Sequence, residues 1–265
     1  MISPELQTAI TAARAAGAIT LEKFGELAQS QIHTKEFKDF VTEVDKACEA
    51  RISGIIRQAF PDDSMLCEEG TLADGGSGRI WIVDPLDGTL NFIHSFPVFS
   101  ISIAMLDTRT GAFETGVVFQ PVLDELFTAE RGKGAALNGR PISVSIRHDH
   151  EGFLLATGLP FSQYHYLDQT LGMLGDLIHE SAGIRRAGSA AIDLAYTACG
   201  RFDGFWEYRL SPWDFAAGVL LVREAGGIVT SFSGNHDVMQ ERSIIAGSAV
   251  THPMILASAQ HHFIK

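Results

Sequence analysis

A short apolar run in the middle of the chain ends in two aspartates, within the sequence WIVDPLDGTLNF of residues 81–92. The run predicts a buried strand, so Asp84 at its end loses hydration that a cation or hydrogen bonds must replace. Asp84 and Asp87 follow each other closely on a turn stiffened by proline, and carboxylates that converge in this way suit a hard cation. Gly88 lets the backbone approach a ligand, and residues 88–92 predict the first turn of a helix, whose N–H groups suit a phosphate. The alternative is a plain turn with an Asx cap.

Two acidic stretches precede this motif. The pair Glu68-Glu69 ends another predicted strand, and because neighbouring side chains of an extended chain point to opposite sides, only one of the two can face a given site. Alone, the pair is better explained as a solvated loop. In the stretch DFVTEVD, Thr42 and Asp45 fit the capping box of a helix. The functional alternative is that Asp45 orients Thr89, which in turn holds a water.

A further candidate, Asp214, belongs to the stretch SPWDFAAGVLLVREAGG of residues 211–227. Ser211 fits the N-cap of a helix and Pro212 its first position, which places Asp214 near the positive end of the helix dipole and keeps it ionised. Taken alone, Asp214 is explained by a capping box. The small residues at positions 216–218 allow this helix to pack closely against its neighbours, which can bring Asp214 into a central cleft.

The first half of the chain predicts two helices and a sheet that position these residues. Ser3-Pro4 begins a predicted helix that runs to Phe24, and a second helix begins at Thr42 and ends before Pro61. Short runs rich in β-branched and aromatic residues follow, and they predict a largely antiparallel sheet with the two helices laid on it. These runs are SMLCEE, RIWIV, VFSISIAML, FETGVVF, ELFTAE and ISVSI, the last at residues 142–146.

From about Glu151 strands and helices alternate, which predicts a second α/β layer. The predicted strands are FLLATG, DGFWEY, GIVTS and SIIAGS, and the predicted helices cover residues 164–178, 189–199, 211–225 and a segment from Thr251. We expect two lobes that share one core. The first lobe, residues 1–147, carries the metal-binding motif, and residues 148–265 form the second.

Composition argues against several classes of protein. The 265 residues carry a net charge of −12, whereas nucleic-acid binding needs clustered Lys and Arg. The cysteines, Cys48, Cys67 and Cys199, include no CxxC pair, which argues against a disulfide scaffold or zinc ribbon and fits a reducing compartment. The N-terminus lacks the pattern of a signal peptide, and no apolar stretch approaches the about 20 residues that span a bilayer. We therefore expect a cytoplasmic protein that contacts neither membrane nor nucleic acid directly.

Together, the acidic stretches resemble the inositol monophosphatase family of metal-dependent, lithium-sensitive phosphatases, over nearly the whole chain. One family signature, W-x-[IV]-D-P-[IL]-D-G-T-x-N-F, is met by residues 81–92. The other, W-D-x-[AS]-[AG] running on to E-A-G-G, is met by residues 213–227. The resemblance implies an α/β fold of the α+β sandwich type, with helices and two sheets in a layered α-β-α-β-α arrangement, and a homodimer.

The resemblance also implies roles for individual residues. Two or three Mg²⁺ ions would be held by Glu68, Asp84, the main-chain carbonyl of Leu86, Asp87 and Asp214. Thr89, supported by Asp45, would hold the attacking water, which Glu68 helps to orient. The substrate would contact Asp87, Gly88, Thr89, Ser189, Ala190, Glu207 and Asp214, with the phosphate on the N–H groups of Gly88 and Thr89 and substrate hydroxyls on Glu207.

Two departures from the family pattern stand out. Leu90 occupies a position that is Thr or another polar residue in many relatives. The stretch before Asp39 does not match the loop that often carries a third metal or a Lys, and Lys35 or Lys38 is the candidate for that position.

The implied reaction is the hydrolysis of a small phosphate monoester, first of all myo-inositol monophosphate to inositol and phosphate, by a water that Mg²⁺ activates. Oxygen ligands favour Mg²⁺ over softer metals. Fructose-1,6-bisphosphatases, nucleotide 3′-phosphatases and histidinol-phosphatases share the metal core and stay open as alternatives, although Trp213 and Glu207 favour the inositol type. An alternative of another class is an accessory factor in RNA synthesis that binds protein partners.

Overall fold

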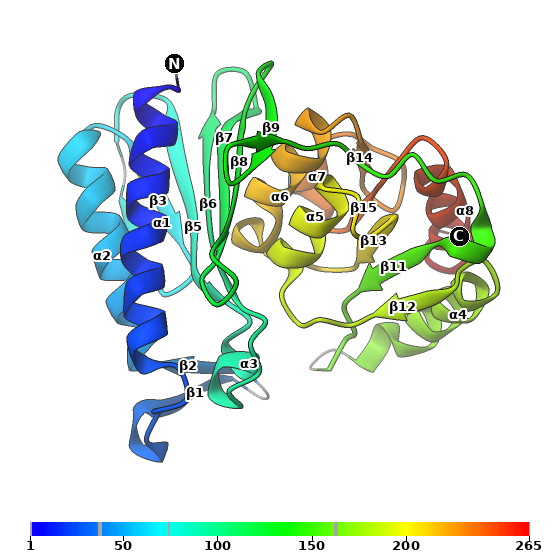
Figure 1. Ribbon diagram of the computed structural model, residues 1–265, viewed down its shortest axis with the longest axis horizontal. Helices are drawn as coiled ribbons and strands as arrows, with labels where there is room; N and C mark the ends of the chain where they lie inside the picture. Colours follow the sequence, from blue (N-terminus) through cyan, green and yellow to red (C-terminus); the bar gives the residue numbers. More distant parts are fainter. Residues whose placement is uncertain (1, 37–38, 71, 74, 162–163, 265) are drawn as a thin grey trace.

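The computed structural model describes residues 2–36, 39–70, 72–73, 75–161 and 164–264. Layers of helices and sheets alternate from left to right in Figure 1. The order is α1 (Pro4–Lys23) with α2 (Glu43–Ala59), an eight-stranded sheet, α5 (Ala190–Ala198) with α6 (Pro212–Glu224), a five-stranded sheet, and α4 (Leu167–His179) with α8 (Thr251–Phe263). The predicted α/β fold with an α-β-α-β-α arrangement is confirmed.

The larger sheet has the strand order β10-β9-β8-β7-β6-β5-β3-β4 and is antiparallel except for the parallel pair β3–β5. Its strands are β3 (Ser64–Cys67), β4 (Leu72–Ala73), β5 (Arg79–Asp87), β6 (Ser100–Asp107), β7 (Ala112–Gln120), β8 (Glu125–Glu130), β9 (Gly134–Leu137) and β10 (Arg140–Pro141). A buried carboxylate anchors β5, because the indole N–H of Trp81 and the Nε–H of Arg79 each donate to Asp63 at 2.9 Å. This contact fixes the strand that ends in the two aspartates.

The first two helices begin as the sequence predicts. Ser3 caps α1, where its Oγ accepts the N–H of Leu6 at 3.1 Å. The predicted capping box starts α2, and there the N–H of Thr42 donates to Asp45 at 2.8 Å. α1 packs on β6 and β7 and α2 packs on β5, around a core that includes the fully buried ring of Phe92.

The smaller sheet has the order β12-β11-β13-β15-β14, in which β12, β11 and β13 are parallel and β15 runs antiparallel to both neighbours. Its strands are β11 (Leu154–Thr157), β12 (Gly183–Arg185), β13 (Gly204–Glu207), β14 (Ile228–Thr230) and β15 (Ile244–Gly247). Small residues let α6 pack closely between the sheets, as predicted. A Cβ at Gly218 would lie 2.5 Å from Leu194 of α5, and one at Gly116 of β7 would lie 3.0 Å from the carbonyl oxygen of Ala217.

Several short elements complete the fold. The hairpin of β1 (Ile32–Glu36) and β2 (Asp39–Thr42) precedes α2, α3 (Thr89–Ile93) follows β5, and α7 (Val238–Glu241) precedes β15. Three short 3₁₀ helices are also present in the described part of the chain: η1 (Gln29–Gln31), η2 (His150–Gly152) and η3 (Tyr164–Tyr166). Of these elements the sequence predicted only the first turn of α3 and helical structure over η3.

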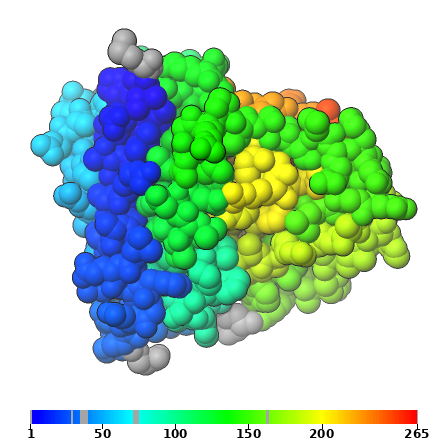
Figure 2. Space-filling model, in the orientation of Figure 1, coloured from blue at the N-terminus to red at the C-terminus, as the bar shows by residue number. Residues whose placement is uncertain are grey.

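The predicted strand at residues 142–146 is wrong. This segment connects the two sheets without a strand, although the N–H of Ile142 donates to Ala135 and that of Val144 to Ala225, at 3.0 and 3.1 Å. Ile142 and Val144 pack, partly buried, against the core between the sheets, whereas Ile146 is 86% exposed. The alternation of apolar residues therefore reflects two contacts with the core and not a strand of the sheet. On the face in Figure 2, green segments lie on both sides of the yellow α5. The predicted lobe boundary between residues 147 and 148 lies farther along the same stretch between the two sheets, and it stays a prediction.

Candidate metal and phosphate site

The two aspartates of the central motif lie at an irregularity of β5. Asp84 pairs with Ser102 of β6 and Asp87 with Ser100, so β5 contains one residue more than its partner between the two pairs. A bulge of this kind bends the strand and changes the direction of its side chains. Asp84 is only 2% exposed, and its Oδ1 accepts the N–H of Leu86 at 3.0 Å. This hydrogen bond offsets part of the lost hydration.

Thr89, the first residue of α3, contacts the carboxylate that the sequence suggested. Its Oγ1 donates to Asp45 at 2.9 Å and lies 3.0 Å from the carbonyl oxygen of Leu86. The other carboxylate oxygen of Asp45 is bound by Thr42 in the capping box of α2. Asp45 therefore caps α2 and contacts Thr89 at the same time. Gly88 precedes Thr89 with a φ of 95°, and no side chain caps the start of α3.

Asp87 connects the central motif to the start of α5. Its Oδ2 accepts the hydroxyl of Ser189 at 2.6 Å and the N–H of Ala191 at 2.8 Å. Ser189 is also the N-cap of α5, where its Oγ accepts the N–H of Ile192. Residues separated by about a hundred positions in the sequence are in this way held at one place.

Asp214 completes the capping box of α6. This was the simpler of the two interpretations of its sequence context. Its Oδ2 accepts the N–H of Ser211 at 2.6 Å. The same carboxylate lies close enough to Asp87 and Glu68 for their charges to raise its pKa. The helix cap thus also brings a negative charge to the central motif.

Burial raises the pKa of all three aspartates, and repulsion between carboxylates adds to the shift at Asp84 and Asp214. For Asp84 burial is the largest cause, and the charge of Glu68 is the next. Burial raises the pKa of Asp87 to about 6, although the hydrogen bonds described above oppose the shift. The pKa of Asp214 is raised well above its usual range by burial and then by the charge of Asp87. The cluster holds negative charge that its own hydrogen bonds do not neutralise.

This arrangement fits a hard divalent cation. Carboxylate and carbonyl oxygens are ligands that Mg²⁺ prefers, and a bound cation would relieve the repulsion that raises these pKa values. Within the residues that the structure describes, no three His, Cys, Asp or Glu side chains already enclose a metal position. The carboxyl groups gathered at the end of β5 still fit a cation, since Mg²⁺ usually keeps several waters and needs no closed protein cage. The side chain of Lys35 and all of Lys38, candidates for a third metal position, lie outside the described part.

A cavity of about 170 Å³ lies beside the carboxylates. Five residues that the sequence assigned to the substrate line it: Asp87, Ser189, Ala190, Glu207 and Asp214. Glu207 ends β13, and burial raises its pKa to about 8 against the opposing charge of Arg186. The carboxyl group of Glu207 lies directly against Gly158, because a Cβ added there would come within 1.9 Å of its Oε1.

Sequence reasoning missed three residues at this site. Asp193 lines the small cavity, is 1% exposed, and its Oδ1 has no hydrogen-bond partner among the described residues. Arg186 lines the same cavity. Asn91 joins the motif to the loop before α5, since its Nδ2 donates to Val98 and Ala187 at 2.7 and 2.8 Å. Charged residues flanking the predicted helix start at Ser189 were the signal available for Arg186 and Asp193.

Known proteins are similar to this chain over nearly its whole length. The inositol monophosphatase family profile matches residues 1–263. A Pseudomonas aeruginosa protein named Nus factor SuhB is 46% identical over an alignment of 266 positions, which covers 98% of this chain and 97% of the relative. Extragenic suppressor protein SuhB from Bartonella henselae superposes with a TM-score of 0.93 at 40% identity, over 97% of this chain and 99% of that one. An IMPase of Thermotoga maritima superposes with a TM-score of 0.88 at 36% identity, over 98% of each chain. The chain belongs to the inositol monophosphatase family.

Proposed function

We propose that this chain is a Mg²⁺-dependent phosphatase that hydrolyses a small phosphate monoester, with myo-inositol monophosphate as the first candidate. The observation that carries the proposal is the group of carboxylates at the end of β5, where Glu68, Asp87 and Asp214 all raise the pKa of buried Asp84. Such a cluster repels a phosphate dianion unless cations are bound. The family membership of the chain supports the same chemistry.

The residues that would hold the cation are Glu68, Asp84, Leu86 through its carbonyl, Asp87 and Asp214. When bound, Mg²⁺ neutralises phosphate charge and lowers the pKa of a water. Thr89 directs its hydroxyl proton to protein acceptors, so its oxygen can accept a hydrogen bond from the attacking water and orient it. The N–H groups of Gly88 and Thr89 would bind phosphate oxygens. Ser189, Ala190 and Glu207 would contact the alcohol part of the ester.

Phosphate release by the purified protein tests this proposal. The assay compares myo-inositol 1-phosphate, fructose 1,6-bisphosphate and 3′-phosphoadenosine 5′-phosphate, each with Mg²⁺ and without it. Turnover that requires Mg²⁺ and favours the inositol ester supports the mechanism and the substrate class together. Turnover that favours another ester supports the proposed mechanism and assigns a different substrate. If no ester is hydrolysed across a wide range of Mg²⁺ concentrations, the proposed phosphatase function is wrong.

A second candidate function comes from the names of the relatives. The Pseudomonas aeruginosa protein, 46% identical to this chain, is named a Nus factor, which agrees with the alternative of an accessory factor in RNA synthesis. We propose this role beside the phosphatase and not in place of it, because a protein-binding role alone gives no reason for the carboxylate cluster. A homodimer in the cytoplasm is the expected setting for both roles.

One substitution separates the two functions. Asp87→Asn removes a charge at the candidate metal site, and its oxygen can still accept the hydrogen bonds from Ser189 and Ala191. Cells that carry this variant should lose a function that depends on catalysis and keep one that depends on binding a protein partner. The outcome is read from growth and RNA synthesis beside phosphate release by the purified variant.

A further inference from the structure

A second, larger cavity opens beside the candidate site. Its volume is about 560 Å³, within the range of roughly 300–1,000 Å³ that small-molecule sites occupy. Gly158, Arg186 and Glu207 line both this cavity and the smaller one that contains Asp87 and Asp214. A ligand whose phosphate lies at the carboxylates can therefore extend past Glu207 into the larger space.

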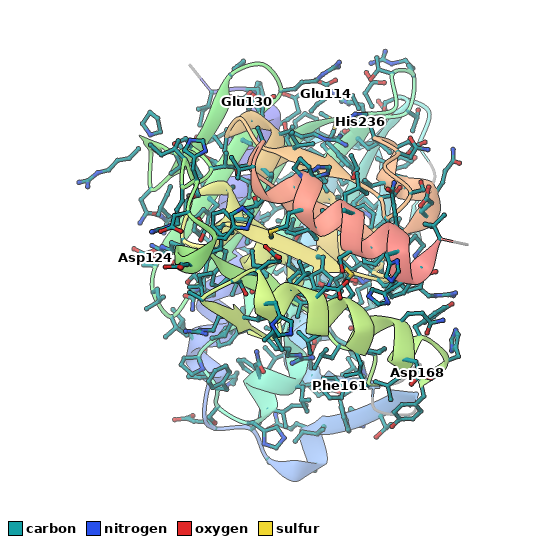
Figure 3. All side chains as sticks on the ribbon, turned by 90° about the vertical axis from the view of Figure 1, so that its right-hand side faces the viewer. Glu114, Asp124, Glu130, Phe161, Asp168 and His236 are labelled. Carbon is teal, nitrogen blue, oxygen red and sulfur yellow. The ribbon has the colours of Figure 1, made fainter. Side chains whose placement is uncertain are left out.

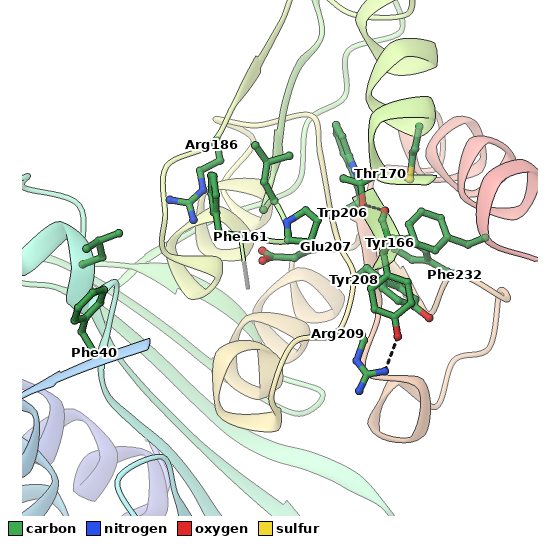
Figure 4. Close-up of a pocket in the computed structure, with 16 residues that line it drawn as sticks. Phe40, Phe161, Tyr166, Thr170, Arg186, Trp206, Glu207, Tyr208, Arg209 and Phe232 are labelled. Carbon is green, nitrogen blue, oxygen red and sulfur yellow. Dashed lines mark hydrogen bonds between the residues drawn. The ribbon is translucent and has the colours of Figure 1, made fainter. Parts of the chain in front are cut away.

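Seven of the 16 residues that line this cavity are aromatic, and we call it the aromatic chamber. Its rings belong to Phe161, Tyr166, Trp206, Tyr208, Phe232 and Phe263, with Phe40 on the opposite side (Figure 4). The Tyr208 ring centroid lies 4.6 Å from those of Tyr166 and Phe263. Because these rings support one another, the wall exists before any ligand binds. Flat apolar faces of this kind suit a flat apolar ligand group.

Two guanidinium groups border the aromatic chamber. Arg209 donates to the hydroxyl of Tyr166 at 2.6 Å (Figure 4). The Cζ of Arg186 lies 4.9 Å from the ring centroid of Phe161, and Phe161 is 49% exposed and lies below α4 in Figure 3. Guanidinium groups attract the faces of aromatic rings, and they donate hydrogen bonds but accept none. The favoured ligand group is therefore a flat ring that carries hydrogen-bond acceptors.

We infer that the aromatic chamber binds the alcohol part of the phosphate ester when that alcohol bears a heteroaromatic ring, as a nucleoside does. The inference rests on the proposed phosphatase function, which places the phosphate in the smaller cavity. The sugar of such an ester lies beside Glu207 and Asp193, and its ring reaches the aromatic wall beyond Gly158. A bare cyclitol phosphate has no group that extends into the chamber.

A matched pair of esters tests the inference. Adenosine 2′-phosphate and 1-O-methylribose 2-phosphate carry the same phosphorylated sugar, and only the first has the ring. With the full-length protein and Mg²⁺, the KM for the adenosine ester should be lower by about fivefold to about 150-fold, the range that stacking of a base on an aromatic side chain gives. Phe161→Ala should remove most of this difference and leave the kcat and KM for the methylribose ester unchanged. Phe96→Ala, a matched control at 50% exposure outside both cavities, should preserve the difference.

Binding of adenosine itself, measured by calorimetry, separates this inference from the phosphatase proposal. Adenosine should bind the wild-type protein and Asp87→Asn equally, and Phe161→Ala and Tyr208→Leu should weaken its binding. Equal KM values for the two esters, with Mg²⁺-dependent turnover intact, would overturn the inference but would not affect the proposed phosphatase function. A Phe161→Ala variant that changes the oligomeric state and not the preference for the ring would also overturn it, because a second copy of the chain would then cover the chamber.

Discussion

The hydroxyl of Thr89 is held between the carboxylate of Asp45, at 2.9 Å, and the carbonyl of Leu86, at 3.0 Å. Its single proton faces these acceptors, which leaves oxygen lone pairs for a water. We expect Thr89→Val to lower kcat by about 10²- to 10⁴-fold, the usual contribution of a positioned proton-transfer group. Val nearly preserves the shape of Thr but leaves a buried carboxylate oxygen of Asp45 without this donor, so the free energy of unfolding should fall by about 1–3 kcal/mol. Phosphate release and denaturant unfolding measure the two quantities.

A matched control exists in α1, where the buried Thr20 donates its hydroxyl to the carbonyl of Gly17 at 2.8 Å. Thr20→Val removes the same kind of hydrogen bond away from the site, so it should leave kcat unchanged. Thr89→Ser keeps the hydroxyl and should retain most of the activity. Full activity in Thr89→Val would mean that this hydroxyl does not orient the water.

The carboxylates around Asp84 predict a stabilisation by Mg²⁺. Because Asp87 and Asp214 raise the pKa of Asp84 by repulsion, a cation that binds the folded protein should raise its melting temperature. At a concentration of about 100 times its Kd, the ion adds about 2.7 kcal/mol. Asp87→Asn should melt at the wild-type temperature or above it without Mg²⁺, because one repelling charge is gone, and should lose most of the Mg²⁺ response.

The control for this prediction is Asp107→Asn at the far end of β6, where Asp107 binds Arg109. It should keep the full response to Mg²⁺ in the same calorimetric scan. A wild-type melting temperature that does not change with Mg²⁺ up to millimolar concentrations would contradict the proposed metal site.

The parts of the site that the sequence predicted are those fixed by local chemistry. The capping boxes of Thr42–Asp45 and Ser211–Asp214 follow from residues three positions apart. The contact between Thr89 and Asp45 spans 44 positions. It was one of two interpretations of the stretch DFVTEVD, and the resemblance to a family then implied it. Local spacing predicts a helix start, but it does not predict which distant element the cap will meet.

Long-range packing explains what the sequence did not predict. The bulge between Asp84 and Asp87 depends on the register of β6, which no residue of the motif itself specifies. The parallel pairing of β3 with β5 likewise needs the neighbouring strand. The aromatic chamber combines residues from β2, α4, β13 and α8, and each of these rings taken alone is an ordinary apolar residue.

The contact between Glu207 and Gly158 predicts a specificity variant. Gly158→Ala would place a methyl group within 1.9 Å of the present position of Oε1. The end of a Glu side chain can rotate away, so the protein should stay folded while the carboxyl group leaves the wall shared by the two cavities. We expect KM for the preferred ester to rise by about tenfold, the effect of losing roughly 1.4 kcal/mol of binding.

A direct comparison with Glu207→Ala tests that explanation. If Gly158→Ala acts through Glu207, the double variant should be no worse than the worse single variant, because the two changes remove the same contact. If the two substitutions instead raise KM independently, so that their fold-changes multiply in the double variant, the methyl group blocks the substrate directly. Gly175→Ala in α4 is the control, because a Cβ there meets nothing within 4 Å.

Buried His252 predicts a loss of stability in acid. It is 4% exposed, and its Nε2 lies 2.9 Å from the hydroxyl of Thr230. Burial, and then the charge of His236, lower its pKa to about 4. In the unfolded chain the ring takes up a proton near pH 6.5, so the unfolded state binds more protons than the folded state between these values. Stability should therefore be complete above about pH 6.5 and fall toward pH 4, by at most about 1.4 kcal/mol per pH unit for one proton.

Other groups titrate in the same range, so the difference between two proteins is the informative quantity. His252→Gln cannot take up a proton, and its amide can still donate to Thr230. It should be less stable than the wild-type protein at pH 7.5, because the ring leaves a cavity, but its stability should fall less steeply on acidification. Urea unfolding at several pH values between 4 and 7.5 gives both curves. Parallel curves would mean that His252 takes up its proton at the same pH in the folded and the unfolded protein, which would exclude an effect of burial on its pKa.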